Sequence, residues 1–258
     1  MAKSQFVEAG GLRIHYLEAG KGSPLILLHG GLATAESLSG PIADLAKTYR
    51  VLAPDSRGHG RTSNPGGTLG YAQMADDVAA FIDALKLERP AIVGYSDGGQ
   101  IALEFGLRHP GKARALGFGG TITGMGDEYL ETLHGWGFRR AGEVDFAQLE
   151  KSFGDFFTSI KQVHGPADEP DYWRGLLEAI STLWLSVPTY GPEVLATITD
   201  PALVITGDRD GAAMAQAVPF FRAMPKGELA VILKAEHEAV LRPLFWDSVK
   251  DFLGRHPA

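Results

Sequence analysis

The residues most able to do chemistry lie at positions 94–99, which read Gly-Tyr-Ser-Asp-Gly-Gly. They follow a short apolar run and precede a helical pattern, so the segment has the form G-x-S-x-G between a strand and a helix. Such a turn holds its serine in a strained conformation, and the residues two before and two after must be small so that the backbones can approach. Gly94 and Gly98 meet this requirement. The following helix directs its first amides at the serine hydroxyl, which predicts a nucleophile at Ser96.

A serine hydroxyl is a weak nucleophile until a base takes its proton, and histidine is the usual base. His237 lies a few residues after the last predicted strand, in the loop before the final helix. In a parallel sheet this loop opens on the same carboxyl edge as Ser96, which favours His237 as the base. The other histidines lie at positions typical of structural or solvated residues, or in turns that follow strands: His15, His29, His59, His109, His134, His164 and His256.

The acid that orients the histidine should come from another loop at that edge. Residues 207–211, Gly-Asp-Arg-Asp-Gly, follow a predicted strand and offer two carboxylates, Asp208 and Asp210. One can hold His237 while the other caps a helix or pairs with Arg209. Their spacing alone does not decide between them.

The elements that must position these residues alternate between strands and helices. Short continuous apolar runs are typical of strands buried on both faces of a parallel sheet. We expect a hairpin around Gly10-Gly11 and helices where the apolar period is helical. This alternation predicts an α/β fold with a mostly parallel sheet of about eight strands, flanked by helices, with the hairpin at one edge. The expected strands are 6–9, 12–18, 25–28, 50–54, 91–94, 115–118, 202–206 and 229–233, and the expected helices are 71–87, 98–109, 212–224 and 240–253.

One segment, 121–195, breaks the alternation because its helical patterns follow one another with no strand between them. It also holds almost half of the aromatic residues. We expect an inserted helical cap at 121–195, with 1–120 and 196–258 forming the core domain. Its aromatic rings would line an apolar pocket or pack in the cap's own core. The candidate substrate-binding residues are Tyr95, Asp97, Trp136 and Trp184.

Composition excludes several classes of protein. The 258 residues are 45% hydrophobic and 21% charged, as in an ordinary globular chain, and they include no cysteine. Disulfides, cysteine metal sites and thiol nucleophiles are therefore absent. A formal net charge of −7 argues against nucleic acid as a partner. No apolar run suggests a signal peptide or a membrane span, so we expect neither a membrane partner nor a location outside the cytoplasm.

Five motifs in register resemble the α/β-hydrolase fold superfamily over essentially the full chain. They are His-Gly-Gly at 29–31, the turn 55–61, the serine turn at 94–99, residues 207–210, and His237, and the chain order Ser, Asp, His agrees. The resemblance implies that Asp210 is the acid, that Asp208 and His29 are structural, and that the oxyanion hole takes one N–H from Gly31 or Leu32 and one from Asp97. The Ser-Asp-Gly-Gly turn resembles that of the biphenyl-hydrolase-like branch, which includes amino-acid ester prodrug hydrolases.

Two departures from the superfamily pattern concern charge. Carboxylates flank the base, as Glu236 and Glu238, and either one near the imidazole would raise the pKa of His237. Another carboxylate, Asp97, follows the nucleophile. It can bind a cationic group such as an α-amino group, or serve only as a favourable charge in the first turn of a helix. Arg57, in the turn 55–61, is expected to be an ion-pair partner inside the fold.

The sequence therefore predicts a serine hydrolase of the carboxylesterase type, acting on an ester, lactone or related acyl substrate through an acyl-enzyme, with water as the second acceptor. We expect no cofactor and no metal. The alternatives are a cofactor-free perhydrolase, a carbon–carbon bond hydrolase, or a small-molecule receptor with a silent triad. Whether the chain is a monomer or a homo-oligomer is left open.

Overall fold

A computed structural model describes residues 2–165 and 169–257 and contains a single sheet of eight strands among them. The strand order is β1-β2-β4-β3-β5-β6-β7-β8, with β1 and β2 antiparallel and the remaining pairs parallel apart from β2 with β4. The expected fold class is thereby confirmed. The strands are β1 (Lys3–Ala9), β2 (Leu12–Ala19), β3 (Pro24–Leu28), β4 (Arg50–Pro54), β5 (Ala91–Tyr95), β6 (Ala115–Gly119), β7 (Ala202–Gly207) and β8 (Gly227–Ile232).

The tight hairpin between β1 and β2 forms where the sequence predicts it. Gly10 and Gly11 have φ values of 58° and 77°, which are the two positive values that a two-residue turn of this kind requires. A side chain at either position would be strained, so the glycine pair fixes the hairpin at the edge of the sheet.

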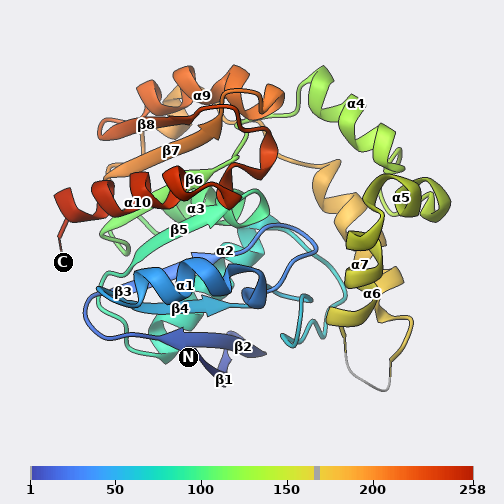
Figure 1. Ribbon diagram of the computed structural model, residues 1–258, viewed down its shortest axis with the longest axis horizontal. Coiled ribbons are helices and arrows are strands. Elements are labelled where there is room, and N and C mark those ends of the chain that lie inside the picture. Colours follow the sequence, from blue (N-terminus) through green and yellow to red (C-terminus); the bar gives the residue numbers. More distant parts are fainter. Residues whose placement is uncertain (1, 166–168, 258) are drawn as a thin grey trace.

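Helices cover both faces of the sheet (Figure 1). Along β3, Leu25 and Leu27 join the core under α1 and α10, while Ile26 and Leu28 join the core under α2, α3 and α9. This alternation within one apolar strand explains why the strand carries no polar face. The flanking helices are α1 (Ser39–Leu45), α2 (Tyr71–Ala84), α3 (Asp97–Arg108), α9 (Gly211–Ala223) and α10 (Pro243–Arg255).

The final helix differs from the expectation of one helix at 240–253. A short 3-10 helix, His237–Leu241, comes first, and α10 begins at Pro243. Arg242 between them is extended, with φ −90° and ψ 133°. Proline disfavours a helical conformation in the preceding residue but is well suited to the first position of a helix, so it separates the two segments.

Four helices between β6 and β7 form a lobe beside the carboxyl ends of the parallel strands (Figure 1). We call α4 to α7 with their connecting segments the helical lobe. Its core is partly aromatic, since the Trp173 ring packs against Phe146 and Phe157 at 5.6 and 5.5 Å. The helices are α4 (Asp127–Trp136), α5 (Phe146–Phe153), α6 (Asp155–Val163) and α7 (Tyr172–Trp184), and a short α8 (Pro192–Leu195) leads back to β7.

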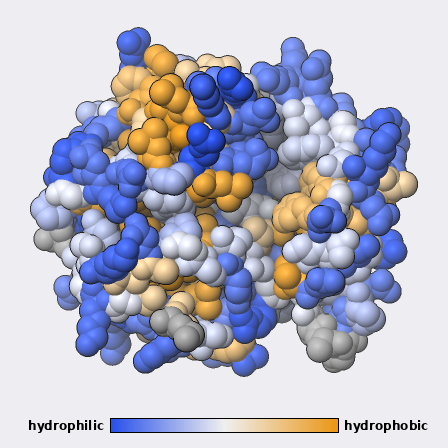
Figure 2. Space-filling model, viewed as in Figure 1, coloured by the Kyte–Doolittle hydropathy of each residue, from blue (hydrophilic) through white to orange (hydrophobic). Residues whose placement is uncertain are grey.

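The surface is hollowed between the helical lobe and the rest of the molecule (Figure 2). The parallel strands end toward this hollow, so loops that follow them reach the boundary between the two parts (Figure 1). Among the described residues, no helix has both the length and the apolar character needed to cross a bilayer.

Candidate active site

Ser96 lies in the turn between β5 and α3, in a conformation that residues other than glycine rarely adopt. Its φ is 55° and its ψ is −118°. A Cβ atom on Gly94 would overlap the carbonyl oxygen of Gly98, and one on Gly98 would overlap that of Leu28. The glycines of the motif are thus required by close backbone approach. The Ser96 N–H donates to the Gly119 carbonyl oxygen at 2.7 Å, which ties the turn to β6.

A hydrogen-bonded chain of three side chains starts at this serine. Ser96 Oγ lies 3.0 Å from His237 Nε2, and His237 Nδ1 lies 2.9 Å from Asp210 Oδ2. The carboxylate fixes the ring with its proton on Nδ1 and leaves Nε2 free to accept the serine proton. Ser96 is half-buried and the His237 side chain is 41% exposed, so the reacting atoms are accessible.

The structure distinguishes the two carboxylates that the sequence leaves open. Asp210 is buried against His237, whereas Asp208 Oδ1 accepts a hydrogen bond from the Ala235 N–H at 3.1 Å. That bond holds the loop that carries His237. Hydrogen bonds to backbone amides, those of Lys234 and Ala235, lower the pKa of Asp208.

Tyr95 supports the histidine from the other side. Its hydroxyl donates to the His237 carbonyl oxygen, and its ring centroid lies 5.4 Å from the imidazole. Gly207 lets the same loop pack closely, because a Cβ there would overlap the Ala235 carbonyl oxygen. In this arrangement Tyr95, expected to bind substrate, contacts the base itself.

Opposing effects act on the pKa of His237. Burial lowers it, while the hydrogen bond and charge of Asp210 and the charges of Glu238 and Asp97 raise it, and the net result lies above the ordinary value. Of the two flanking glutamates, Glu238 therefore has the larger effect on the pKa of the imidazole.

The turn after β3 lies close to the serine, since a Cβ on Gly30 would lie 3.4 Å from the Ser96 Cβ. Leu32 has a φ of 59°, a left-handed conformation that costs a leucine about 1 to 2 kcal/mol. Within the described part of the chain, the N–H groups of Gly31, Leu32 and Asp97 have no hydrogen-bond acceptor, so each can donate to an oxyanion, and the choice between Gly31 and Leu32 stays a prediction. Gly31 allows the approach, since a Cβ there would lie 2.5 Å from Asp97 Oδ2 and 2.7 Å from the Trp184 ring.

The carboxylate of Asp97 is buried next to the nucleophile and holds two aromatic donors. Tyr71 OH donates to Oδ1 at 2.8 Å, and Trp184 Nε1–H lies 2.8 and 2.9 Å from the two oxygens. Burial raises the pKa of Asp97, while these hydrogen bonds and the charges of His29 and His237 oppose the rise. Sequence reasoning missed Tyr71, whose position at the start of a helix gives no sign of this contact.

The tryptophans expected to bind substrate have different surroundings. Trp184, the last residue of α7, is buried against Asp97, and its ring packs edge-on against Phe138 at 5.2 Å. Trp136 is half-buried and lies one layer farther out, 6.1 Å from Trp184 and 5.3 Å from Phe153. Trp184 thus joins the lobe to the site directly, and Trp136 does so through Trp184.

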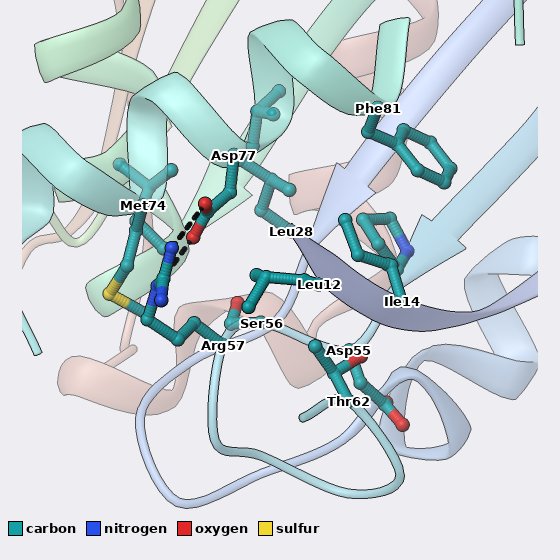
Figure 3. A pocket seen from close by; sticks show the side chains of 13 residues that line it. Leu12, Ile14, Leu28, Asp55, Ser56, Arg57, Thr62, Met74, Asp77 and Phe81 are labelled. Carbon is teal, nitrogen blue, oxygen red and sulfur yellow. Dashed lines mark hydrogen bonds and ion pairs between the residues drawn. The ribbon is translucent and has the colours of Figure 1, made fainter. Parts of the chain in front are cut away.

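A buried ion pair connects Arg57, in the turn after β4, with Asp77 of α2. Arg57 and Asp77 form a buried pair with two hydrogen bonds of 2.8 and 2.6 Å, as the sequence predicts for Arg57 (Figure 3). Figure 3 shows this pair beside a cavity of about 20 Å³ that apolar side chains also line. The volume suits about one water molecule and no larger ligand.

Donors with metal-binding spacing occur at one place in the described chain, where His15, Glu36 and Asp55 come together. These groups already have partners. Asp55 accepts from the Ala35 and Arg61 amides and pairs with His15 at 2.7 Å, and Glu36 pairs with Arg61. Burial opposes ionisation of Asp55, but these partners hold its pKa at about 2. The cluster is therefore a structural network.

Comparison with known proteins agrees with this geometry. The sequence model of the alpha/beta hydrolase fold family matches residues 23–242, and the chain belongs to this family. It is 37% identical to the 2-hydroxy-6-oxo-6-(2'-aminophenyl)hexa-2,4-dienoic acid hydrolase of Metapseudomonas resinovorans over 218 residues, 80% of this chain and 74% of that protein.

Solved structures with the same architecture include a serine hydrolase involved in carbazole degradation, with a TM-score of 0.80 and 26% identity over 99% of this chain and all of the other. The enol-lactonase from Burkholderia xenovorans LB400 has a TM-score of 0.70 and 26% identity, over 97% of this chain and 100% of that one. The relatives thus include hydrolases named for different substrates.

Proposed function

We propose that this chain is a serine hydrolase that cleaves the bond next to a carbonyl carbon through a covalent acyl intermediate on Ser96. The observation that carries the proposal is the hydrogen-bonded chain from Ser96 through His237 to Asp210, at 3.0 and 2.9 Å, on a turn that strains the serine. Nucleophile, base and orienting acid come from three separate loops, which is the arrangement that acyl transfer requires.

The reaction divides into two half-reactions. Ser96 Oγ attacks the carbonyl carbon as His237 Nε2 takes the hydroxyl proton, and the N–H groups of Leu32 and Asp97 hold the oxyanion. When the tetrahedral intermediate collapses, the leaving group departs with its bonding electron pair and takes that proton from His237. Water then gives a proton to His237 and its oxygen to the acyl carbon, which releases the acid and restores Ser96.

A carbon–carbon bond is the first candidate for the bond that is cleaved. The compound in the name of the 37% identical relative contains a ketone and a carboxylic acid but no ester, so hydrolysing it breaks a bond between carbons. A carbon leaving group must delocalise its electron pair before it accepts a proton, and a conjugated dienoate does so. The similarity to this relative supports the same chemistry here.

An ester or lactone bond is the second candidate, and Asp97 favours it. This carboxylate is buried next to Ser96, and Asp97 and Glu238 both act on His237 beside it. A dienoate carries a negative charge that these groups would repel, whereas a neutral or cationic ester would not meet this repulsion. The similarity to an enol-lactonase supports this candidate as well.

One experiment distinguishes the candidates. The wild-type chain and Ser96→Ala are assayed on 2-hydroxy-6-oxo-6-phenylhexa-2,4-dienoate and on p-nitrophenyl esters from acetate to decanoate, with an aminoacyl ester added. We expect turnover of one class by wild type and a loss of several orders of magnitude in the mutant. The class that is turned over identifies the bond.

Labelling of Ser96 by a fluorophosphonate tests the nucleophile without assuming a substrate. Labelling of wild type together with no turnover of either class would move the assignment toward a perhydrolase. Equal turnover by wild type and Ser96→Ala would contradict the proposal. Absence of both labelling and turnover would favour a receptor with a silent triad.

A further inference from the structure

We propose that His164, from the helical lobe, is a positioning residue that holds the oxyanion turn in its working conformation. His164 follows α6 and is buried. Its Nε2 lies 2.9 Å from the Leu32 carbonyl oxygen, and its Nδ1 lies 2.9 Å from the Gly60 nitrogen. The inference rests on the proposed function only in that Leu32 must serve an oxyanion.

The two partners of His164 fix its tautomer. The Gly60 N–H can only donate, so Nδ1 is the unprotonated nitrogen, and the Leu32 carbonyl can only accept, so Nε2 carries the proton. A neutral ring satisfies both contacts and a protonated one does not. Burial lowers the pKa of His164 to about 4, in keeping with the neutral ring.

The bond from His164 acts on a residue with a left-handed backbone conformation, Leu32. The N–H and the carbonyl of Leu32 flank one Cα that has a φ of 59°, in a region where leucine is strained. Fixing the carbonyl restricts rotation about that Cα and so maintains the direction of the N–H. Without the bond, relaxation of the turn would move the donor away from the oxyanion.

Two further histidine rings, those of His59 and His29, pack beside His164 near the oxyanion turn. The His59 ring lies 5.4 Å from the rings of both His29 and His164. His29 is itself fixed, because Nδ1 lies 2.8 Å from the Gly30 carbonyl oxygen and Nε2 accepts from the Ser56 N–H at 2.9 Å. These tilted and edge-on rings connect the end of β3, the turn after β4 and the helical lobe.

The lobe makes other contacts with the turn after β4 that do not reach Leu32. Tyr172 OH donates to the Gly58 carbonyl oxygen at 3.1 Å, and the Gly165 N–H donates to that of Gly60 at 3.3 Å. These bonds dock the lobe, whereas His164 also extends to the oxyanion turn. Tyr172→Phe therefore provides a matched control that weakens docking and leaves Leu32 held.

The experiment compares His164→Gln, His164→Asn and Tyr172→Phe with wild type. A glutamine amide places its N–H donor at the level of Nε2 and can keep the bond to the Leu32 carbonyl, whereas an asparagine amide lies at the level of Nδ1 and leaves that carbonyl unpaired. The readouts are the rate of fluorophosphonate labelling of Ser96, and kcat and KM on the preferred substrate. Circular dichroism shows whether each variant is folded.

We expect His164→Asn to lower the labelling rate and kcat by about 10- to 100-fold with KM within about twofold, since weakened oxyanion binding affects the transition state. His164→Gln and Tyr172→Phe should stay within about threefold of wild type. A folded His164→Asn that labels at the wild-type rate would overturn the inference. So would equal losses in His164→Asn and Tyr172→Phe, which would reduce His164 to a docking contact. Failure of the wild type to label would instead contradict the proposed function.

Discussion

The carboxyl edge of the sheet and the helical lobe both contribute to the site, but they do so by different means. At the edge, backbones approach so closely that Gly94, Gly98 and Gly207 leave no room for a Cβ. The lobe reaches the site through side chains, above all Trp184 and His164. Backbone geometry therefore sets the reacting atoms, and side-chain packing sets their surroundings.

The two regions also differ in whether they affect the reaction step or the choice of substrate. The three hydrogen-bonded side chains, Ser96, His237 and Asp210, all lie in loops that follow strands of the sheet. Asp97, the charged group beside Ser96, is instead held partly by Trp184 of the lobe. Changes at the edge should affect every substrate alike, and changes around Asp97 should affect substrates according to their charge.

The largest expected effect lies at the edge, where two aspartates differ in role. Asp210→Asn should lower kcat by about 10,000-fold on any substrate, because an amide no longer stabilises the imidazolium or fixes its tautomer. Asp208→Asn keeps an oxygen for the Ala235 N–H and should stay within about threefold of wild type, since a neutral acceptor still makes this kind of bond. Steady-state kinetics on one substrate measures both, and comparable losses would contradict the assignment of Asp210.

Stability should show the same contrast between edge and lobe. Gly94→Ala places a Cβ on the Gly98 carbonyl oxygen and should reduce the free energy of unfolding by about 3 kcal/mol. Gly175→Ala lies in α7 with no atom within 4 Å of the new Cβ and should stabilise by about 0.5 to 1 kcal/mol. Denaturant titration of both variants tests the pair, and similar losses would mean that the lobe is packed as tightly as the edge.

The same difference explains what could be predicted from the sequence. The strands, the serine turn and the positions of Ser96 and His237 follow from short local patterns, because glycine spacing and chain order report backbone geometry directly. Only the resemblance to the superfamily favours Asp210 over Asp208, since both lie in the same loop and their partners are distant in the sequence. Tyr71, Trp184 and His164 meet the site through packing between separate elements, and no local pattern encodes those contacts.

A smaller effect, at the boundary between the two regions, tests selection by charge. Asp97→Asn keeps one acceptor oxygen, which Tyr71 and Trp184 can share as they share Oδ1 now, but removes the negative charge. If this charge binds an ammonium group, kcat/KM for alanine p-nitrophenyl ester should fall about 10- to 100-fold, and that for p-nitrophenyl propionate should change by less than about threefold. These esters differ only by the amino group.

For an anionic substrate, we expect Asp97→Asn to change kcat/KM in the opposite direction. If the chain hydrolyses a dienoate, Asp97→Asn removes a repulsive charge and should raise kcat/KM for that compound. Equal losses for the two p-nitrophenyl esters would show that Asp97 acts through the geometry of the turn and not through its charge.

The smallest expected effect concerns the pH dependence of the base. His237 works in its neutral form, and its pKa is raised above the ordinary value, so kcat/KM should fall as the pH drops through that raised pKa. Glu238→Gln removes one of the charges that raise it. The acidic limb of the profile should therefore move to lower pH by less than about one unit, and activity on that limb should increase.

Glu236→Gln is the matched control, because Glu236 precedes the same histidine and is exposed like Glu238, but it is not among the main causes of the shift in the His237 pKa. Its profile should coincide with that of wild type. The shift in Glu238→Gln should also shrink as salt is added, since an exposed carboxylate acts through solvent that salt screens. If both variants move the limb equally, the pKa of His237 responds to overall negative charge, and the specific placement of Glu238 has no role in setting it.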